Sequence, residues 1–266
     1  MHSRRTGSET LLSFLQRDSR SLHENDGSFF IFRPSANRTK HQTGKGKTMS
    51  KLRQERIRRF METDVYLVIG HEFTAGRDIF SVVEEAAKGG VRTVQLREKN
   101  CSGKELTLLA EKFRKKCDEL GLLMIMNDHV DIALACGADG VHLGQDDMTL
   151  EAARRIAPDL ILGRSTHSLA QALEAQAQDA DYVNLGPIFP TATKQTPVKP
   201  LGTAIIREAA PVLKIPFTVM GGIKAWNMKE LFDAGAKITA MVTEITAAED
   251  VAGKTRELCA LFPLKK

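Results

Sequence analysis

The amino-acid sequence predicts a single-domain (β/α)8 barrel preceded by an N-terminal extension. From Asp64 onward, eight short runs rich in β-branched and aliphatic residues alternate with amphipathic helical runs, within about 200 residues. Polar or glycine-rich residues follow seven consecutive predicted strands, which is where such barrels carry their active residues. A doubly wound sheet is the alternative, but Gly70-His71-Glu72-Phe73 lacks the glycine-rich pattern of its first turn.

The predicted elements follow from these patterns in order along the chain. Residues 50–60 suit a helix and lead directly into the first apolar run. The predicted strands cover residues 65–69, 93–97, 122–126, 140–142, 160–163, 182–185, 217–220 and 238–242. The helical patterns between and after them cover residues 77–89, 103–120, 129–136, 149–157, 168–179, 202–213, 225–234 and 247–261. A strand followed by a helix, repeated eight times, is the unit that closes a barrel.

Residues 1–48 differ from the rest of the chain. They are rich in Ser, Arg, Asn and Thr and show no helical or strand period, so we expect them to be disordered. Their Arg/Ser enrichment resembles an organelle transit peptide. The favoured alternative is that Met49 is the true start, since a helix-competent stretch follows it. The predicted domains are an extension over residues 1–48 and a barrel catalytic domain over residues 49–266.

Composition narrows the class of protein. A hydrophobic fraction of 42% supports a substantial core. No apolar run reaches the roughly 18 residues of a membrane span. The net charge of +5 combines +9 over residues 1–60 with −4 over residues 61–266, which argues against nucleic-acid binding by the barrel. The cysteines show no metal-binding spacing, which predicts reduced thiols and a cytoplasmic protein; they are Cys101, Cys117, Cys136 and Cys259.

Gln95, Arg97 and Lys99 carry the first functional signal. Alternate residues of a strand share one face, so an amide and two cations point into the same space. In a closed barrel that face turns toward the interior. We therefore expect these three residues to meet an anionic ligand.

Asp128 and Asp147 follow adjacent predicted strands and are expected to converge. Two neighbouring carboxylates repel unless a cation joins them. Hard oxygen ligands suit Mg²⁺, which commonly bridges to substrate phosphates. Together with Arg97, Lys99 and Lys194, such an ion would neutralise a diphosphate.

Further donors follow the later strands. Ser165, Thr191 and Thr193 supply hydroxyl groups. Gly221-Gly222 lets backbone N–H groups approach a second phosphate, and a helix expected to begin near Ala225 would point its positive end there. The pattern predicts one diphosphate and one monophosphate group in the same site. Because no nucleophile–base pair is evident, the expected chemistry is diphosphate departure followed by capture of a second substrate.

Several segments resemble the thiamine phosphate synthase family. They are VQLREK at 94–99, NDHVD at 127–131, GADGVHLGQDD at 137–147, STH at 165–167, GPIFPTATK at 186–194, GGI at 221–223 and TAAED at 246–250. The resemblance covers roughly residues 52–262. It implies a (β/α)8 barrel that joins 4-amino-2-methyl-5-hydroxymethylpyrimidine diphosphate to 4-methyl-5-(2-phosphoethyl)thiazole, or to its carboxylate. The implied products are thiamine phosphate and pyrophosphate.

The resemblance also implies roles for individual residues. Gln95, Arg97 and Lys99 would hold the pyrimidine diphosphate, and Asn127 would contact the pyrimidine. Asp128 and Asp147 would bind Mg²⁺, while Ser165 and Lys194 would bind the diphosphate. The implied ligands of the thiazole phosphate are Thr191, Thr193, Gly222, Val242 and Thr243. Arg97, Lys99, Ser165 and Lys194 are thus the implied catalytic residues.

Four positions depart from the family pattern. Thr243-Glu244 stands where many members have Ser-Ala, so Glu244 adds a negative charge near a phosphate site. Arg164 stands where a small apolar residue is common, and Lys237 replaces a common acidic residue.

Two other functions stay open at this point. Thiazole tautomerases share the barrel and use a histidine in a Ser-x-His segment, which His167 matches. A non-catalytic barrel that binds thiazole phosphate is the other alternative. The diphosphate-binding residues favour the synthase. The expected partners are small-molecule substrates, with no nucleic acid and no membrane, and the sequence leaves a homo-oligomer open.

Overall fold

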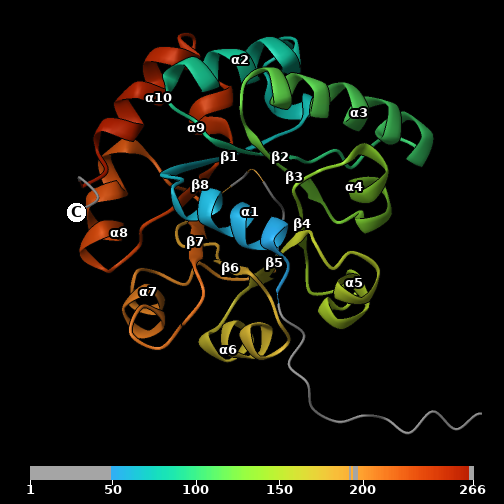
Figure 1. The fold of residues 1–266 in the computed structure, drawn as a ribbon. Coiled ribbons are helices and arrows are strands. Elements are labelled where there is room, and N and C mark those ends of the chain that lie inside the picture. Colours follow the sequence, from blue (N-terminus) through green and yellow to red (C-terminus); the bar gives the residue numbers. More distant parts are fainter. Residues whose placement is uncertain (1–48, 192, 194–196, 264–266) are drawn as a thin grey trace, which may run out of the picture. The chain divides into compact units, whose positions relative to one another are not determined.

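Eight parallel strands close into a barrel in the order in which they occur in the chain, with helices around the outside (Figure 1). The structure is a computed structural model that describes residues 49–191, 193 and 197–263. Each strand pairs with its sequence neighbours, and β1 closes the ring by pairing with β8, so that Tyr66 lies beside Ala240. The predicted (β/α)8 barrel is confirmed.

The bounds of the elements are these. The strands are β1 (Val65–Ile69), β2 (Thr93–Leu96), β3 (Leu123–Asn127), β4 (Gly140–Leu143), β5 (Ile161–Thr166), β6 (Tyr182–Leu185), β7 (Phe217–Met220) and β8 (Thr239–Met241). The α-helices are α1 (Lys51–Met61), α2 (Ile79–Gly89), α3 (Gly103–Glu119), α4 (Val130–Cys136), α5 (Leu150–Ile156), α6 (Leu169–Ala177), α7 (Ala204–Ala209), α8 (Met228–Asp233), α9 (Thr243–Thr246) and α10 (Val251–Ala260). Two 3-10 helices, η1 (His71–Phe73) and η2 (Ala225–Asn227), follow β1 and β7.

The structure changes some predicted boundaries. β5 extends to Thr166 because Ser165 and Thr166 pair with Asn184 and Leu185 of β6, so two polar residues belong to the strand and not to the loop. The helix predicted over residues 225–234 is divided into η2 and α8. The one predicted over residues 247–261 is shortened to α10, and the short helix α9 precedes it. These short helices pack along the barrel wall, where tertiary contacts decide their length.

Two apolar layers hold the barrel together. One lies between the strands and the outer helices, and the other fills the barrel interior. The interior layer comprises Phe60, Tyr66, Leu123, Ile125, Ile161, Tyr182, Ile238 and Ala240. Gly163 makes room for one of these side chains, because a Cβ atom at this position would lie 2.1 Å from Cζ of Tyr182. The interior is therefore a packed core, as expected for a barrel of this size.

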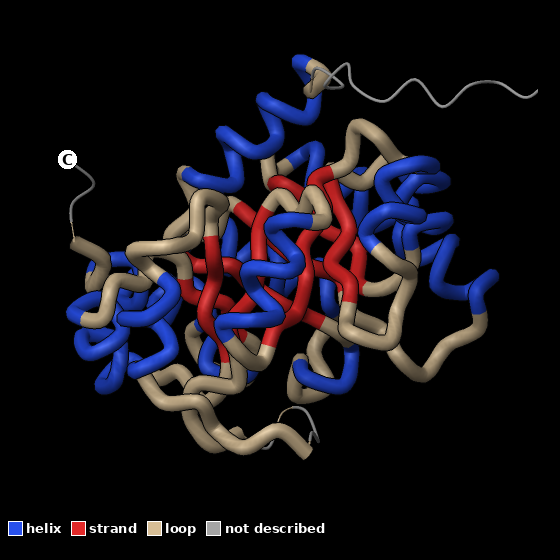
Figure 2. Tube along the Cα trace, turned by 90° about the horizontal axis from the view of Figure 1, so that it is seen from below, coloured by secondary structure: helices blue, strands red, loops and turns tan. Residues whose placement is uncertain are grey.

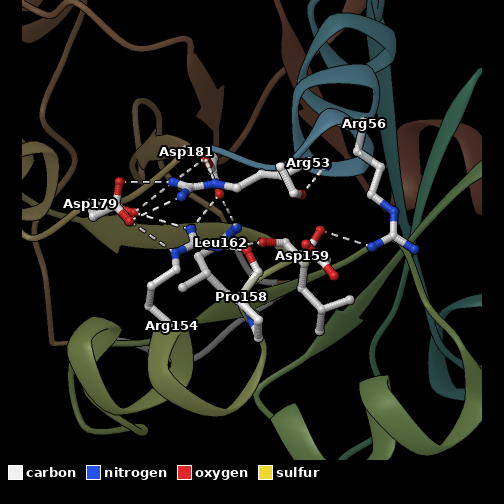
Figure 3. Close-up of polar contacts among 10 residues, drawn as sticks. Arg53, Arg56, Arg154, Pro158, Asp159, Leu162, Asp179 and Asp181 are labelled. Atoms are coloured by element: carbon white, nitrogen blue, oxygen red, sulfur yellow. Dashed lines mark hydrogen bonds and ion pairs between the residues drawn. The ribbon is translucent and has the colours of Figure 1, made fainter. Parts of the chain in front are cut away.

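Helix α1 covers the amino-terminal ends of the strands. Its Phe60 packs into the interior layer, with its ring centroid 4.3 Å from that of Tyr182. Arg53 forms ion pairs with Asp181 at 2.7 Å and with Asp179 at 2.8 Å, and Arg154 of α5 pairs with the same two carboxylates (Figure 3). Asp181 also accepts the backbone N–H of Leu162 at 2.7 Å.

A second cluster repeats this arrangement two strands away. Asp139 precedes β4 as Asp181 precedes β6, and it accepts the backbone N–H of Met124 at 2.9 Å. Arg56 of α1 and Arg114 of α3 pair with it at 3.3 Å and 2.7 Å. Two buried carboxylates therefore fix α1 to the barrel. Figure 2 shows α1 at one end of the barrel, with long loops at the other end.

Two further findings concern the helices and the cysteines. Within the described ranges, the helices are all too short or too polar to cross a membrane. The four cysteines are free thiols.

Candidate active site

A cavity of about 380 Å³ lies at the mouth of the barrel, the end at which the strands have their carboxyl termini. Its volume is in the range of small-molecule sites, and it lies where parallel barrels carry their active residues. The predicted site residues that line it are Gln95, Arg97, Asn127, Ser165, Thr191, Thr193, Gly222, Val242 and Thr243. Lys99, Asp128 and Asp147 lie on the adjoining strand ends, and Lys194 lies outside the described residues.

A chain of hydrogen bonds crosses the barrel beneath the cavity. Gln95 Nε2 donates to the Tyr66 hydroxyl at 2.6 Å, and this hydroxyl lies 3.0 Å from that of Tyr182. His142 continues the chain, with Nδ1 2.9 Å from the Tyr182 hydroxyl and Nε2 2.9 Å from Ser165 Oγ. Burial raises the pKa of both phenols, so both keep their protons.

The links of this chain are compatible with donation that runs from Gln95 to Ser165. Because the Gln95 amide donates, Tyr66 can use its own proton toward Tyr182, and Tyr182 can donate to Nδ1 of His142. In this arrangement the ring carries a proton on Nε2 and donates it to Ser165 Oγ. The Ser165 hydroxyl is left to donate its proton to an acceptor in the cavity, as an anionic ligand requires.

Arg97 provides a cation on the β2 side of the cavity. Its Nη1 lies 3.1 Å from Oε1 of Glu72, and its guanidinium lies over the Phe73 ring at 5.8 Å. Both partners belong to η1, which follows the neighbouring strand β1. These contacts hold the guanidinium at the rim of the cavity, where it can also pair with oxygen atoms of a phosphate.

Asp128 and Asp147 converge as the sequence predicts. A left-handed backbone conformation at Asp128, with φ of 62°, turns its side chain toward Lys99, with which it forms an ion pair. The two carboxylates lie within hydrogen-bonding reach of each other. Burial raises the pKa of Asp147, and the neighbouring Asp128 raises it further. Burial opposes ionisation of Asp128 too, but the hydrogen bonds from Lys99 and Asp147 and the charge of Lys99 together outweigh it and lower its pKa.

This pair of carboxylates fits a magnesium ion that also binds a substrate. Mg²⁺ prefers oxygen ligands and is usually held by one or two carboxylates together with phosphate oxygens and water. In the part of the chain that the structure describes, no group of three or more His, Cys, Asp or Glu side chains is placed to hold a metal. The donor set therefore suits an ion that completes its coordination with a diphosphate.

Arg164 positions the loop that carries Asp147. Its guanidinium donates to the backbone oxygens of Gln145 at 3.1 Å and Met148 at 3.3 Å. Gly144 N–H in turn donates to Asp147 Oδ2 at 2.5 Å. Burial lowers the pKa of Arg164 from its high ordinary value. The arginine at this position therefore holds the β4–α5 loop in place.

Hydroxyl groups and glycines gather on the opposite side of the cavity. Thr193 Oγ1 lies 3.5 Å from Thr243 Oγ1, and Thr193 N–H donates to Thr191 Oγ1 at 3.3 Å. Gly221 and Gly222 have φ angles of 103° and 62°, which glycine adopts without strain. A Cβ atom at Gly222 would lie 2.4 Å from the Pro190 carbonyl oxygen, so only glycine lets these two loops meet.

The helix expected to begin near Ala225, with its positive end toward the second phosphate, is not present in that form. Ala225 begins η2 and not an α-helix, and its backbone N–H donates to Glu244 Oε1 at 3.4 Å. Glu244 also pairs with Lys224, whose Nζ lies 2.8 Å from Oε2. A charged pair, and not an open helix terminus, therefore lies beside the threonines.

Two further polar side chains point to a ligand. Asn127 Nδ2 is buried and has no hydrogen-bond partner among the described residues, although the residue lines the cavity. A bound acceptor would satisfy this donor. His167 lies at hydrogen-bonding distance from the Gly186 carbonyl oxygen, with Nδ1 at 2.6 Å. Nδ1 therefore donates to this oxygen, which leaves Nε2 as the ring nitrogen that can meet a ligand.

Comparison with known proteins assigns the barrel to a family. Residues 65–245, from β1 to α9, match the family described as thiamine monophosphate synthase. The chain belongs to the thiamine monophosphate synthase family.

Individual relatives cover most of the barrel. Thiamine-phosphate synthase from Shouchella clausii is 46% identical over 74% of this chain and 94% of its own length. The enzyme of the same name from Halalkalibacterium halodurans is 44% identical over 71% of this chain and 90% of its own length. The solved structure of a thiamine phosphate pyrophosphorylase from Pyrococcus furiosus is 35% identical, with a TM-score of 0.69, covering 75% of this chain and 95% of its own. 3-Hexulose-6-phosphate synthase, 18% identical with a TM-score of 0.57, shares the fold alone.

Sequence reasoning missed several residues in and around the cavity. Tyr66 and Tyr182 are the two tyrosines of the chain, and each lies in a short apolar run that reads as ordinary core. The signal that could have found them is strand alternation, since Tyr66 and Val68 face inward with Gln95. Glu72 and Lys224 were also missed, because their pairing depends on which loops meet at the mouth.

Proposed function

We propose that this chain joins 4-amino-2-methyl-5-hydroxymethylpyrimidine diphosphate to 4-methyl-5-(2-phosphoethyl)thiazole, giving thiamine phosphate and pyrophosphate. Family membership supports the reaction. The observation that carries it is the division of one cavity into two anion-binding halves. Cations and paired carboxylates lie on the β2–β5 side, and hydroxyl groups and glycines lie on the β6–β8 side.

Each half suits one substrate. Gln95 and Asn127 would orient the pyrimidine at the bottom of the cavity, and Arg97, Lys99 and Ser165 would hold its diphosphate, together with Lys194. Asp128 and Asp147 would hold Mg²⁺. Bound there, the ion would neutralise charge on the departing diphosphate. Thr191, Thr193, Gly222, Val242 and Thr243 would bind the phosphate arm of the thiazole.

The chemistry needs positioning and positive charge. The bond between the pyrimidinylmethyl carbon and the diphosphate oxygen breaks, and its electron pair leaves with pyrophosphate. The lone pair of the thiazole nitrogen then forms the new carbon–nitrogen bond. Neither event moves a proton, so Arg97, Lys99 and Ser165 act by stabilising the leaving group, and the cavity walls align the nucleophile.

The decisive experiment mixes the purified protein with both substrates and Mg²⁺ and follows thiamine phosphate and pyrophosphate. We expect both products in equal amounts. A thiazole tautomerase is the second candidate, because His167 reaches the cavity with an acceptor nitrogen. Isomerisation of the thiazole without coupling would refute the synthase and support the tautomerase.

The domain assignment and setting belong to the same proposal. We place catalysis within residues 49–266, in the cytoplasm, which suits the free cysteines. Deleting residues 1–48 is expected to leave kcat and KM unchanged, and a large loss of kcat would contradict this assignment. A homo-oligomer stays a prediction, which light scattering on the purified protein tests.

A further inference from the structure

Lys224 and Glu244 form an ion pair inside the phosphate half of the cavity. Lys224 follows β7, and Glu244 lies in α9 directly after β8, so adjacent strands bring them together. Both line the same cavity as Thr193 and Thr243. The Lys224 side chain is 43% exposed and that of Glu244 is 15% exposed. The pair is therefore part of the cavity wall and differs from a solvated surface pair.

Among the described lining residues, Lys224 is the cation on the side of the cavity that holds Thr193 and Thr243. Among the described lining residues, only Arg97 and Lys224 carry a permanent positive charge. Arg97 follows β2, and β1 and β8 separate that strand from β7. A phosphate dianion beside Thr193 and Thr243 thus has Lys224 as the described lining cation on its own side of the cavity. A lysine side chain is long and flexible enough to exchange one anionic partner for another.

Glu244 makes the contacts that a bound anion would make. One carboxylate oxygen accepts from the Lys224 ammonium at 2.8 Å, and the other accepts from the Ala225 backbone N–H at 3.4 Å. An ammonium and a backbone N–H are the kinds of donor that a phosphate uses in proteins. A phosphate and this carboxylate cannot share both donors without strong like-charge repulsion.

We propose that Lys224 binds the phosphate of the thiazole substrate, and that Glu244 is an internal competitor which this phosphate displaces. The proposal rests on the proposed function, since it names a residue that recognises one of its two substrates. Displacement of Glu244 would also make the site selective for the phosphorylated thiazole over the thiazole alcohol. A thiazole alcohol carries no charge with which to displace Glu244, whereas the phosphorylated thiazole exchanges one anion for another.

Steady-state kinetics with Lys224→Met and Glu244→Gln test the two roles separately. In Lys224→Met, the KM for the thiazole phosphate is expected to rise about 10-fold or more, with kcat and the KM for the pyrimidine diphosphate nearly unchanged. Lys224→Arg should restore most of the affinity. In Glu244→Gln, loss of the competitor is expected to lower the KM for the thiazole phosphate about threefold.

Lys229→Met is the matched control. Lys229 lies in α8, five residues after Lys224, and pairs with Asp233 at 2.7 Å on the exposed surface. The variant makes the same change of charge outside the cavity, so its KM values should equal those of the parent protein. An unchanged KM for the thiazole phosphate in Lys224→Met would overturn the binding role. A raised KM in Glu244→Gln would overturn the competitor role.

Calorimetry separates this inference from the proposed function. Titration of the full chain with the phosphorylated thiazole and with its alcohol needs no turnover. We expect Lys224→Met to weaken binding of the phosphorylated form alone, whereas equal losses for both compounds would refute the inference. A protein that forms no thiamine phosphate would refute the proposed function and leave this titration decisive.

Discussion

Replacing Gly163 by Ala should destabilise the barrel through its interior. The added Cβ atom would lie 2.1 Å from Cζ and 2.4 Å from the hydroxyl oxygen of Tyr182, whose ring is fully buried. The ring must move, but Phe60 packs against it, with the two ring centroids 4.3 Å apart. Overpacking of this kind costs about 1–3 kcal/mol. Loss of the Tyr182 hydrogen bonds to Tyr66 and His142 adds about 1 kcal/mol each, so we expect a total of about 3–5 kcal/mol.

Urea unfolding followed by circular dichroism measures this loss. Gly103→Ala is the matched control, because Gly103 begins α3 and an added Cβ atom there meets nothing within 4 Å. The control should be neutral or more stable by up to about 1 kcal/mol, since alanine favours the helix. A Gly163→Ala variant whose free energy of unfolding falls by less than about 1 kcal/mol would refute the account of the packed interior.

Three further predictions concern the site and the opposite end of the barrel. Asp128→Asn should lower kcat/KM about 100-fold or more at fixed Mg²⁺ while the thermal midpoint stays near that of the parent; a rate within a few-fold would remove its assigned role. Arg53→Ala removes one partner of the buried Asp181 carboxylate and should cost about 3–5 kcal/mol of unfolding free energy. Arg58→Ala, on the exposed face of α1, should leave the thermal midpoint unchanged. Burial raises the pKa of Asp179, but hydrogen bonds and charge from Arg53 and Arg154 together outweigh burial and lower this pKa. The stabilisation by Asp179 is therefore complete above its ordinary pKa and disappears as the pH falls through the lowered value. Asp179→Asn should therefore make the unfolding free energy less dependent on pH below about 4, and an unchanged acid profile would contradict the assignment.

Periodicity predicted the barrel because each strand and helix leaves a local pattern. The order of strand ends then predicted that Asp128 and Asp147 converge, since sequential strands are neighbours in a barrel. The end of β5 was placed wrongly because Ser165 and Thr166 look like loop residues, and only their pairing with β6 makes them strand.

Other features depend on partners far away in the sequence. The hydrogen-bond chain from Gln95 to Ser165 joins five strands, and no local pattern states which inward side chains touch. The Lys224–Glu244 pair likewise depends on the distance between two loops. Sequence reasoning identified Glu244 as an added negative charge near a phosphate site, and the structure supplies its partner.

The position of α1 has a practical consequence. Ser50 caps the first turn of α1 by accepting the backbone N–H of Arg53, at the end of the barrel opposite the cavity. A carrier protein or a solid support joined in front of Ser50 would therefore leave the mouth facing away from the attachment. The barrel suits immobilisation, or fusion behind another enzyme, through its amino-terminal end.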